Sequence, residues 1–95
     1  AQSAVDLQCQ SLVLYQFSTC PFCIKVRQEM HRLALPIELR DSQNNSTHRS
    51  ELQQGSGGTQ VPCLKITDSN GQTRWLKESS AIVAYFRERF AAPAA

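Results

Sequence analysis

Apolar residues recur along the chain at two different spacings, and each change of spacing marks a new element. Runs that are mostly apolar, or that alternate with polar residues, indicate strands, whereas apolar residues three or four positions apart indicate helices. This pattern predicts strands at 12–17, 37–40, 61–66 and 73–76 and helices at 21–34, 46–54 and 78–90. The predicted order is therefore β-α-β-α-β-β-α.

Two connections indicate how the strands should pair. A strand, a helix and a strand follow one another over residues 12–40, so these two strands should be parallel with a right-handed crossover. Asn70-Gly71 is a strong hairpin signal, so the last two strands should be antiparallel. The Gly-Ser-Gly-Gly segment at 55–58 should end the second helix as a flexible connector, because phosphate-binding loops come after a strand and before a helix.

Each predicted helix has an apolar stripe that should face a core. The stripe residues are Val26, Met30 and Leu33 in the first helix, Leu52 in the second, and Ile82, Phe86 and Phe90 in the third. The polar side of the first helix should be solvated, and it consists of Lys25, Arg27, Gln28, Glu29 and Arg32. His31 should also be a surface residue rather than a catalytic base.

The composition describes one ordinary globular domain, which we place at residues 8–91, with flexible ends at 1–7 and 92–95. The net charge of +2 is too small to favour a nucleic acid or a membrane surface as a partner, and no run is long enough for a membrane-spanning helix. Residues 1–7 lack the basic start and apolar middle of a signal peptide, so we expect a cytoplasmic location. Because the first residue is not Met, an upstream anchor or signal stays open.

The candidate chemistry lies in Cys20-Pro21-Phe22-Cys23, between the first predicted strand and the first predicted helix. The unpaired N–H groups and the dipole of a helix N-terminus favour an anion, and a thiolate is the anion that this site would stabilise. Cys20 precedes the first turn and should be exposed, whereas Cys23 lies one turn in and should be partly covered. That asymmetry suits a nucleophile and a resolving thiol, because only the thiolate attacks and access limits its rate.

Other uses of a C-x-x-C motif fit the sequence less well. A zinc site needs more ligands, but Cys9 and Cys63 are isolated and no closely spaced pair of histidines is present, so we expect no metal. A structural disulfide framework is unnecessary for a chain with enough apolar residues for a core. We interpret Cys9 as an incidental thiol. The redox interpretation is favoured because the motif falls between a strand and a helix.

Three motifs together resemble those of glutaredoxins, which have a thioredoxin-like fold. They are Cys-Pro-Phe-Cys at 20–23, Val61-Pro62 and Glu78-Ser79, and the resemblance covers residues 12–90. The last motif, with Ile82 and Tyr85 following it, also resembles the N-terminal domain of glutathione transferases. The resemblance implies an α/β thioredoxin-like fold, with a four-stranded mixed sheet and helices on both faces.

The resemblance also implies a glutathione site, formed by Cys20, Phe22, Val61, Pro62, Glu78 and Ser79. Pro62 would be cis and would turn the backbone of Val61 towards Cys20, where it could pair with glutathione like an added strand. The Glu78 carboxylate suits the ammonium group of the γ-glutamyl end, and the Ser79 hydroxyl suits its carboxylate. Helix capping is the alternative role for both, and the two roles are compatible. Cys63 would be buried filler, because strand alternation points it away from the side of Pro62.

The sequence departs from the glutaredoxin pattern near the thiols. Phe17 stands where many glutaredoxins have a lysine, so a cation that would support the thiolate is missing there. Arg40, Arg49 and Lys25 are the candidate substitutes. Phe22 replaces the common tyrosine, which removes a hydroxyl group.

The function that the resemblance implies is that of a glutathione-dependent thiol–disulfide oxidoreductase. Cys20 would attack a glutathione mixed disulfide or a protein disulfide, and a further glutathione or Cys23 would release the product. Glutathione would be the cosubstrate, glutathionylated or disulfide-bonded proteins the partners, and the chain a monomer. Two alternatives stay open: a transferase-like module that binds glutathione without redox turnover, and an iron–sulfur cluster carrier dimer, against which the stiffening effect of Pro21 argues.

Overall fold

The computed structural model describes residues 7–68 and 70–90 and contains all seven predicted elements. They are β1 (Leu12–Gln16), α2 (Pro21–Arg32), β2 (Glu38–Asp41), α3 (Ser46–Ser56), β3 (Cys63–Thr67), β4 (Thr73–Lys77) and α4 (Ser79–Phe90). A helical turn at residues 7–9 precedes β1. Of the predicted flexible ends at 1–7 and 92–95, residues 1–6 and 92–95 lie outside the described residues, as does residue 91, whereas Leu7 belongs to the helical turn. The domain bounds stay a prediction.

The four strands form one mixed sheet in the order β2-β1-β3-β4. β1 pairs with β2 in parallel and with β3 antiparallel, and β3 pairs with β4 antiparallel. The predicted parallel pair and the predicted hairpin are therefore both confirmed. In the hairpin turn, the N–H of Gly71 donates to the carbonyl oxygen of Asp68 over 2.9 Å.

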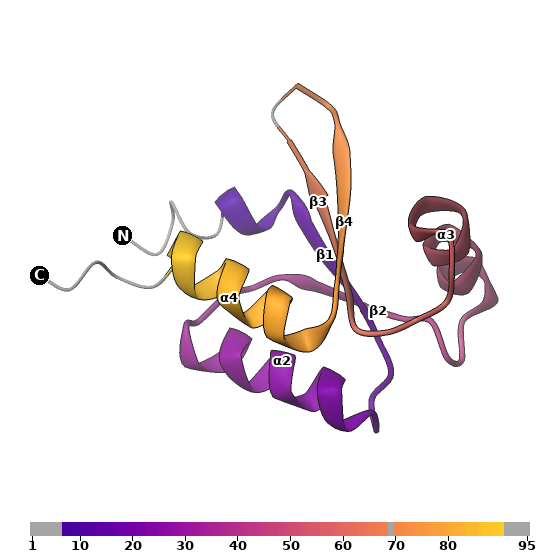
Figure 1. Ribbon diagram of the computed structural model, residues 1–95, viewed down its shortest axis with the longest axis horizontal. Helices are drawn as coiled ribbons and strands as arrows, with labels where there is room; N and C mark the ends of the chain where they lie inside the picture. The colour runs from indigo at the N-terminus through magenta and orange to yellow at the C-terminus, as the bar shows by residue number, and fades with distance from the viewer. Residues whose placement is uncertain (1–6, 69, 91–95) are drawn as a thin grey trace, which may run out of the picture.

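Helices cover both faces of the sheet, as the fold class predicted. α2 and α4 lie side by side on one face, and α3 lies on the other (Figure 1). The larger core fills the space beneath α2 and α4, and its fully buried residues include Leu12, Leu14, Val26, Leu64, Ile82 and Phe86. A smaller core beneath α3 contains Tyr15, Leu52 and Cys63, which confirms Cys63 as buried filler. Cys9 is also buried, in the larger core.

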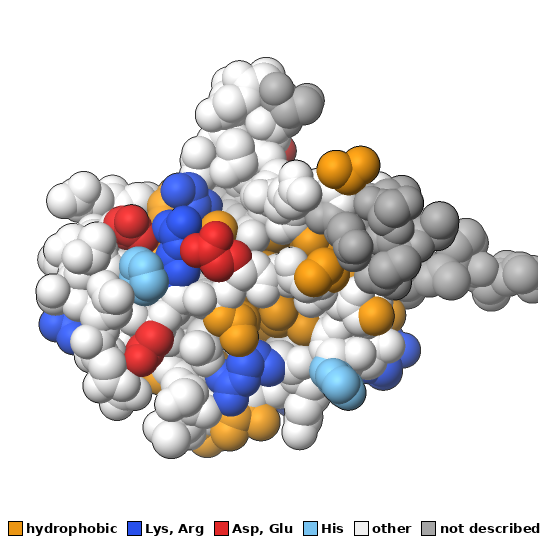
Figure 2. Space-filling model, turned by 180° about the vertical axis from the view of Figure 1, so that it is seen from behind, with side chains coloured by type: hydrophobic (Ala, Val, Ile, Leu, Met, Phe, Trp, Pro, Cys, Tyr) orange, Lys and Arg blue, Asp and Glu red, His pale blue; other side chains and the backbone are white. Residues whose placement is uncertain are grey.

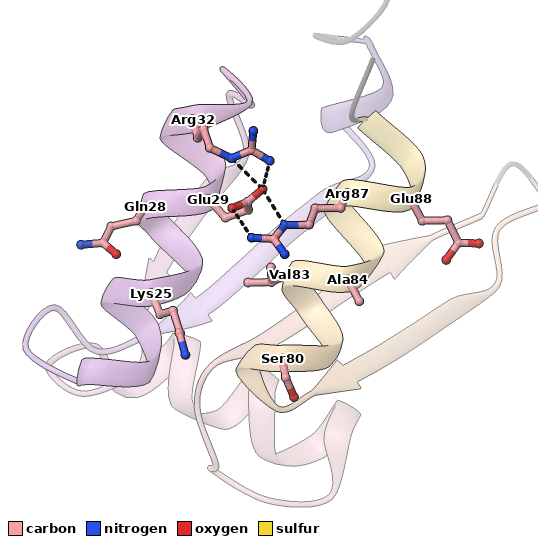
Figure 3. A pocket seen from close by; sticks show the side chains of 9 residues that line it. All are labelled: Lys25, Gln28, Glu29, Arg32, Ser80, Val83, Ala84, Arg87 and Glu88. Carbon is pink, nitrogen blue, oxygen red and sulfur yellow. Dashed lines mark hydrogen bonds and ion pairs between the residues drawn. The ribbon is translucent and has the colours of Figure 1, made fainter. Parts of the chain in front are cut away.

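Glu29 corrects one expectation about the surface of α2. We placed it on the solvated side of the helix, but it is only 7% exposed. Its carboxylate accepts hydrogen bonds from Arg32 on the same helix and from Arg87 on α4, with the Nε atom of Arg87 3.2 Å from Oε2 (Figure 3). The period of a helix shows which residues share a side, but it does not show that a second helix covers that side.

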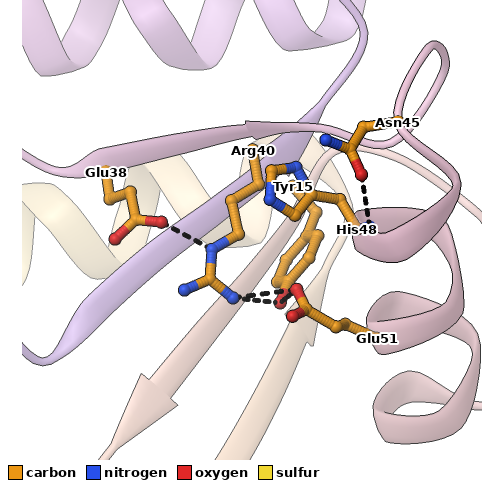
Figure 4. A network of polar contacts seen from close by, with 6 residues as sticks. All are labelled: Tyr15, Glu38, Arg40, Asn45, His48 and Glu51. Carbon is orange, nitrogen blue, oxygen red and sulfur yellow. Dashed lines mark hydrogen bonds and ion pairs between the residues drawn. The ribbon is translucent and has the colours of Figure 1, made fainter.

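A polar network holds α3 against the sheet (Figure 4). The Arg40 guanidinium on β2 donates to the Tyr15 hydroxyl on β1 and to the Glu51 carboxylate on α3, over 2.9 Å each. The Tyr15 hydroxyl donates to the same Glu51 carboxylate, also over 2.9 Å. Three elements are thus joined by one set of charge-assisted hydrogen bonds, next to the apolar anchor Leu52.

Gly55 is not part of a flexible connector, as the sequence had suggested. It lies inside α3, which continues to Ser56 and ends at Gly57, a residue with a φ of 84°. A Cβ atom on Gly55 would come within 1.9 Å of the Trp75 ring. Glycine is needed there because the ring of a residue on β4 packs directly against the helix backbone.

Candidate active site

The two cysteines of the motif lie at the N-terminal end of α2 and differ in exposure. Cys20 is the residue before the first helical position, and its carbonyl oxygen accepts a hydrogen bond of 2.9 Å from the N–H of Ile24. Pro21 occupies the first helical position, where its missing N–H costs nothing. The Cys20 side chain is partly exposed, whereas Cys23 is fully buried. The predicted asymmetry in access is therefore present.

The surroundings of the two thiols move their pKa values in opposite directions. Burial opposes ionisation of Cys20, but hydrogen bonds from the N–H and thiol of Cys23 and from the N–H of Phe22 outweigh it and, with the charge of Arg27, lower the Cys20 pKa. Burial and the neighbouring Cys20 raise the pKa of Cys23 to about 11, against a hydrogen bond from the N–H of Phe17. One thiol is thus prepared as a thiolate and the other as its hydrogen-bond donor.

Arg27 supplies the cation that the sequence analysis did not find. Its guanidinium donates to the main-chain carbonyl oxygens of Ser18 (2.8 Å) and Phe17 (3.3 Å) and to the side-chain oxygen of Gln16. It therefore ties α2 to the loop that leads into Cys20. We had assigned Arg27 to the solvated side of α2; it is half-buried there, and its guanidinium contacts the preceding loop. The available signal was its spacing, since a residue two helical turns after Cys20 lies on the same side of the helix.

The three substitutes that we had named for the missing lysine have other contacts. Arg40 binds Glu51 and Tyr15 in the network beneath α3, and Arg49 donates to the carbonyl oxygens of residues 42 and 43. Lys25 lines a hollow of about 990 Å³ between α2 and α4, and none of the predicted site residues lines that hollow (Figure 3). The charge that lowers the pKa of Cys20 is that of Arg27.

A separate hollow brings most of the predicted glutathione site together. Its volume is about 270 Å³, and it is lined by Phe22, Gln60, Val61, Pro62, Glu78, Ser79 and Ser80. Five of these residues were predicted, and they come from three segments that are far apart in the sequence. Cys20, the sixth predicted residue, lies two positions before Phe22. Gln60 and Ser80 were missed, although each directly adjoins a predicted motif.

The backbone has an unusual conformation at two places in this hollow, next to Val61 and at Glu78. The Val61–Pro62 peptide bond is cis, as predicted. Within the described residues, the main-chain N–H and C=O of Val61 make no hydrogen bond. Glu78 has a φ of 73°, and its carbonyl oxygen accepts from the N–H of Ile82 over 3.1 Å.

The side chains of Glu78 and Ser79 do not cap α4 in this structure. Neither makes a hydrogen bond or an ion pair to another described residue, although both stand at the start of the helix. Glu78 is exposed and Ser79 is half-buried. Their polar groups are therefore available to a ligand in the hollow beside Val61. Their assignment to glutathione stays a prediction.

Among the residues that the structure describes, there is neither a grouped metal site nor a helix that could span a membrane. In that part of the chain, no three His, Cys, Asp or Glu side chains are grouped so that they could hold a metal ion. No helix in the described ranges combines the length and apolar character needed to cross a membrane.

Comparison with known proteins identifies the family. Residues 14–94 match the model of the glutathione S-transferase N-terminal domain, which is most of the chain. The chain belongs to this family. The transferase-like features noted at Glu78-Ser79 agree with the match. The resemblance to a thioredoxin-like fold with features of this domain is therefore confirmed.

Two curated relatives and one solved structure illustrate the similarity. Over 73 residues, the domain is 34% identical to prostaglandin E synthase 2 of Mus musculus and 38% identical to that of Danio rerio, and it spans 18% of the length of each. Its fold matches that of maleylacetoacetate isomerase from Anaeromyxobacter dehalogenans with a TM-score of 0.65 at 27% identity, covering 88% of this chain and 39% of that one. The isomerase structure has dicarboxyethyl glutathione and citrate in its active site.

Proposed function

We propose that this domain is a glutathione-dependent thiol–disulfide oxidoreductase, with Cys20 as the nucleophile and Cys23 as the resolving thiol. The observation that carries the proposal is the opposite pKa shift of two neighbouring thiols at a helix N-terminus, with only Cys20 accessible. A lowered pKa raises the fraction of attacking thiolate, and access lets a disulfide reach it.

Reduction of a glutathione mixed disulfide needs Cys20 alone. The Cys20 thiolate attacks the glutathione sulfur, the new S–S bond forms, and the bond to the substrate sulfur breaks. The substrate leaves as a thiolate, which takes a proton from water. A glutathione thiolate then attacks the glutathione sulfur on Cys20, so that glutathione disulfide leaves and the Cys20 thiolate is restored.

Reduction of a protein disulfide would use both cysteines. Cys20 forms a mixed disulfide with one protein sulfur and releases the other. Cys23, once deprotonated, attacks Cys20, which releases the second protein thiol and leaves a Cys20–Cys23 disulfide. Two glutathione molecules reduce that disulfide and leave as glutathione disulfide. The pKa of Cys23, raised to about 11 by its burial, keeps this thiol protonated while Cys20 is reduced.

Glutathione would bind in the hollow of 270 Å³ beside the thiols. The unpaired main-chain groups of Val61 would pair with its cysteine residue, and Phe22 would cover the sulfur. The Glu78 carboxylate would bind the γ-glutamyl ammonium group, and Ser79 with the start of α4 would bind the carboxylate. A maleylacetoacetate isomerase of similar fold has glutathione bound in its active site, which supports glutathione as the ligand. We also propose a cytoplasmic location, where thiols stay reduced.

The test is reduction of the mixed disulfide of glutathione and 2-mercaptoethanol by this chain, coupled to glutathione reductase and NADPH. We expect turnover by the wild type, none by Cys20→Ser, and retained turnover by Cys23→Ser, which should lose most activity on protein disulfides. Cys63→Ser is the matched control, since Cys63 is buried on the other face of the sheet. Full activity of Cys20→Ser would refute the mechanism.

A second candidate is a glutathione-binding module that acts only with a further domain. It is favoured by one observation, namely that the chain spans 18% of the curated relatives' length. In that case the isolated chain would bind glutathione, measured by calorimetry, but would not turn over the mixed disulfide.

A further inference from the structure

β2 leaves part of one sheet face uncovered. It is an edge strand, and among the described residues no other strand pairs with its outer side. Leu39 on β2 stands opposite Leu14 on β1, so both point to the side of the sheet that α2 covers. Leu14 is fully buried, whereas Leu39 is 45% exposed. α2 therefore covers β1 but leaves part of the edge strand β2 exposed.

Two adjoining hollows turn this uncovered region into a groove along the outer side of α2. One, of about 600 Å³, lies between α2 and β2, and the other, of about 530 Å³, lies along α2 itself. They share Arg27 and His31, so they form one continuous surface, which we call the α2–β2 groove. Its apolar lining residues are Ile24, Met30, Ala34, Leu35, Pro36, Ile37 and Leu39.

The two charged side chains that line the α2–β2 groove, Arg27 and Arg32, are both positive. Its charged or titratable lining residues are Arg27, His31 and Arg32, and none of the lining residues is acidic. Arg32 is neutralised by Glu29, but Arg27 donates only to uncharged oxygens and has no carboxylate partner among the described residues. Figure 2 shows a face on which hydrophobic side chains gather beside Lys, Arg and His side chains.

The groove leads to the reactive thiol. Ile24 begins it, one helical turn from Cys20, and Ile24 and Cys20 are joined by a hydrogen bond of 2.9 Å. From Cys20 to His31 the helix rises roughly 16 Å, which an extended segment of about five residues spans. A chain that places its cysteine at Cys20 can therefore continue along the groove.

We infer that the α2–β2 groove binds an extended segment of a protein partner, with apolar side chains alternating with Asp or Glu, next to the cysteine that Cys20 attacks. This inference rests on the proposed function, since it assigns the substrate-recognition surface of the same thiol. The apolar side chains cover Leu39 and its neighbours, and the carboxylates meet the unneutralised charge of Arg27. Small disulfides do not use the groove.

Binding is measured separately from turnover. The probe is a short fluorescein-labelled peptide of alternating Val or Leu and Asp or Glu that ends in serine in place of cysteine, and its comparison peptide has Lys at every acidic position. Fluorescence anisotropy gives the dissociation constant of each. Because the probes carry no sulfur, the result does not depend on whether the chain reduces disulfides.

Two variants change the groove without touching the thiol site. Leu39→Glu replaces an exposed apolar contact by a negative charge. His31→Glu places a negative charge among the residues that line the groove. Each should weaken binding of the acidic peptide by about tenfold and leave turnover of the small glutathione mixed disulfide unchanged. Leu7→Glu is the matched control, since Leu7 is equally apolar, 66% exposed and outside the groove. If Leu39→Glu fails to fold, His31→Glu decides.

Three outcomes would overturn the inference. The first is equal affinity of the wild type for the acidic and the lysine peptide, and the second is unchanged affinity in both groove variants. The third is a dimer of this chain in sedimentation that Leu39→Glu dissociates, because the groove would then be a contact between copies. Loss of mixed-disulfide turnover by the wild type would reject the proposed function instead and leave these binding results standing.

Discussion

The guanidinium of Arg27 donates a hydrogen bond of 2.8 Å to the carbonyl oxygen of Ser18, two residues before the nucleophilic Cys20. This contact crosses from the second turn of α2 to the loop after β1. It places a positive charge near the thiol and fixes the path of the chain into the motif. Phe17, where many glutaredoxins have a lysine, can therefore be apolar while the Cys20 thiolate still has a cation nearby.

Replacing Arg27 should make Cys20 less acidic. In Arg27→Met the charge and the loop contacts are lost, so the Cys20 pKa should rise and alkylation by iodoacetamide at neutral pH should slow, by up to about tenfold per pKa unit. The measurement is alkylation rate against pH in the Cys23→Ser background. Arg27→Lys is the matched control, because it keeps the charge but not the planar set of donors. The pKa of Cys20 in this variant should lie between its values in the wild type and in Arg27→Met. An unchanged pKa in Arg27→Met would exclude this role.

Glu78 and Ser79 should act on glutathione affinity rather than on stability. Glu78→Gln keeps the size of the side chain and the same penalty for a positive φ, so it tests the charge alone. Glu78→Gln and Ser79→Ala should each weaken glutathione binding by about 1–3 kcal/mol, the usual cost of a lost charged hydrogen bond. Calorimetric titration and thermal unfolding separate the two roles. If both variants bind normally and only melt earlier, capping is their whole role.

The ion pairs of Glu29 should make stability depend on pH in a defined window. Hydrogen bonds from Arg32 and then Arg87 lower the pKa of the Glu29 carboxyl to about 2, from an ordinary value of 4.5. A lowered carboxyl pKa stabilises the fold above the unfolded-state value, and that contribution is lost as pH falls from about 4.5 to about 2.

Glu29→Gln should therefore lower the free energy of unfolding by about 1–2 kcal/mol at neutral pH. The expected loss is modest because both arginines are largely exposed, so that solvent screens the ion pairs. The difference from the wild type should shrink as pH falls below about 4.5. Urea unfolding at several pH values measures it, with Glu88→Gln, an exposed acid on α4, as the control. A difference that stays constant with pH would show that packing, not charge, is responsible.

Gly55 should tolerate no side chain. In Gly55→Ala the new Cβ would stand 1.9 Å from the Trp75 ring, so α3 or the ring must move, at a cost of about 1–3 kcal/mol. Gly58→Ala is the matched control, because nothing lies within 4 Å of its Cβ position. Equal unfolding free energies for the two variants in urea would contradict the close packing of α3 on β4.

Local patterns in the sequence determined the elements, the hairpin and the thiol pair. The order of seven elements follows from spacing and turn residues, which act within a few positions of one another. The exposure of Cys20 and the burial of Cys23 follow for the same reason, since both depend on one helix and its first turn. Val61-Pro62 and Glu78-Ser79 were located through their resemblance to family motifs.

Only the tertiary structure decided what stands beside each of these elements. Arg27 and Glu29 look alike in the sequence, as polar residues on one helix, yet one binds the loop before Cys20 and the other is covered by α4. The sequence around Gly55 is typical of a connector, but in the structure the ring of Trp75, twenty positions later, packs against Gly55 inside α3. Such contacts depend on distances between segments that no local pattern records, because they are set when the helices pack onto the sheet.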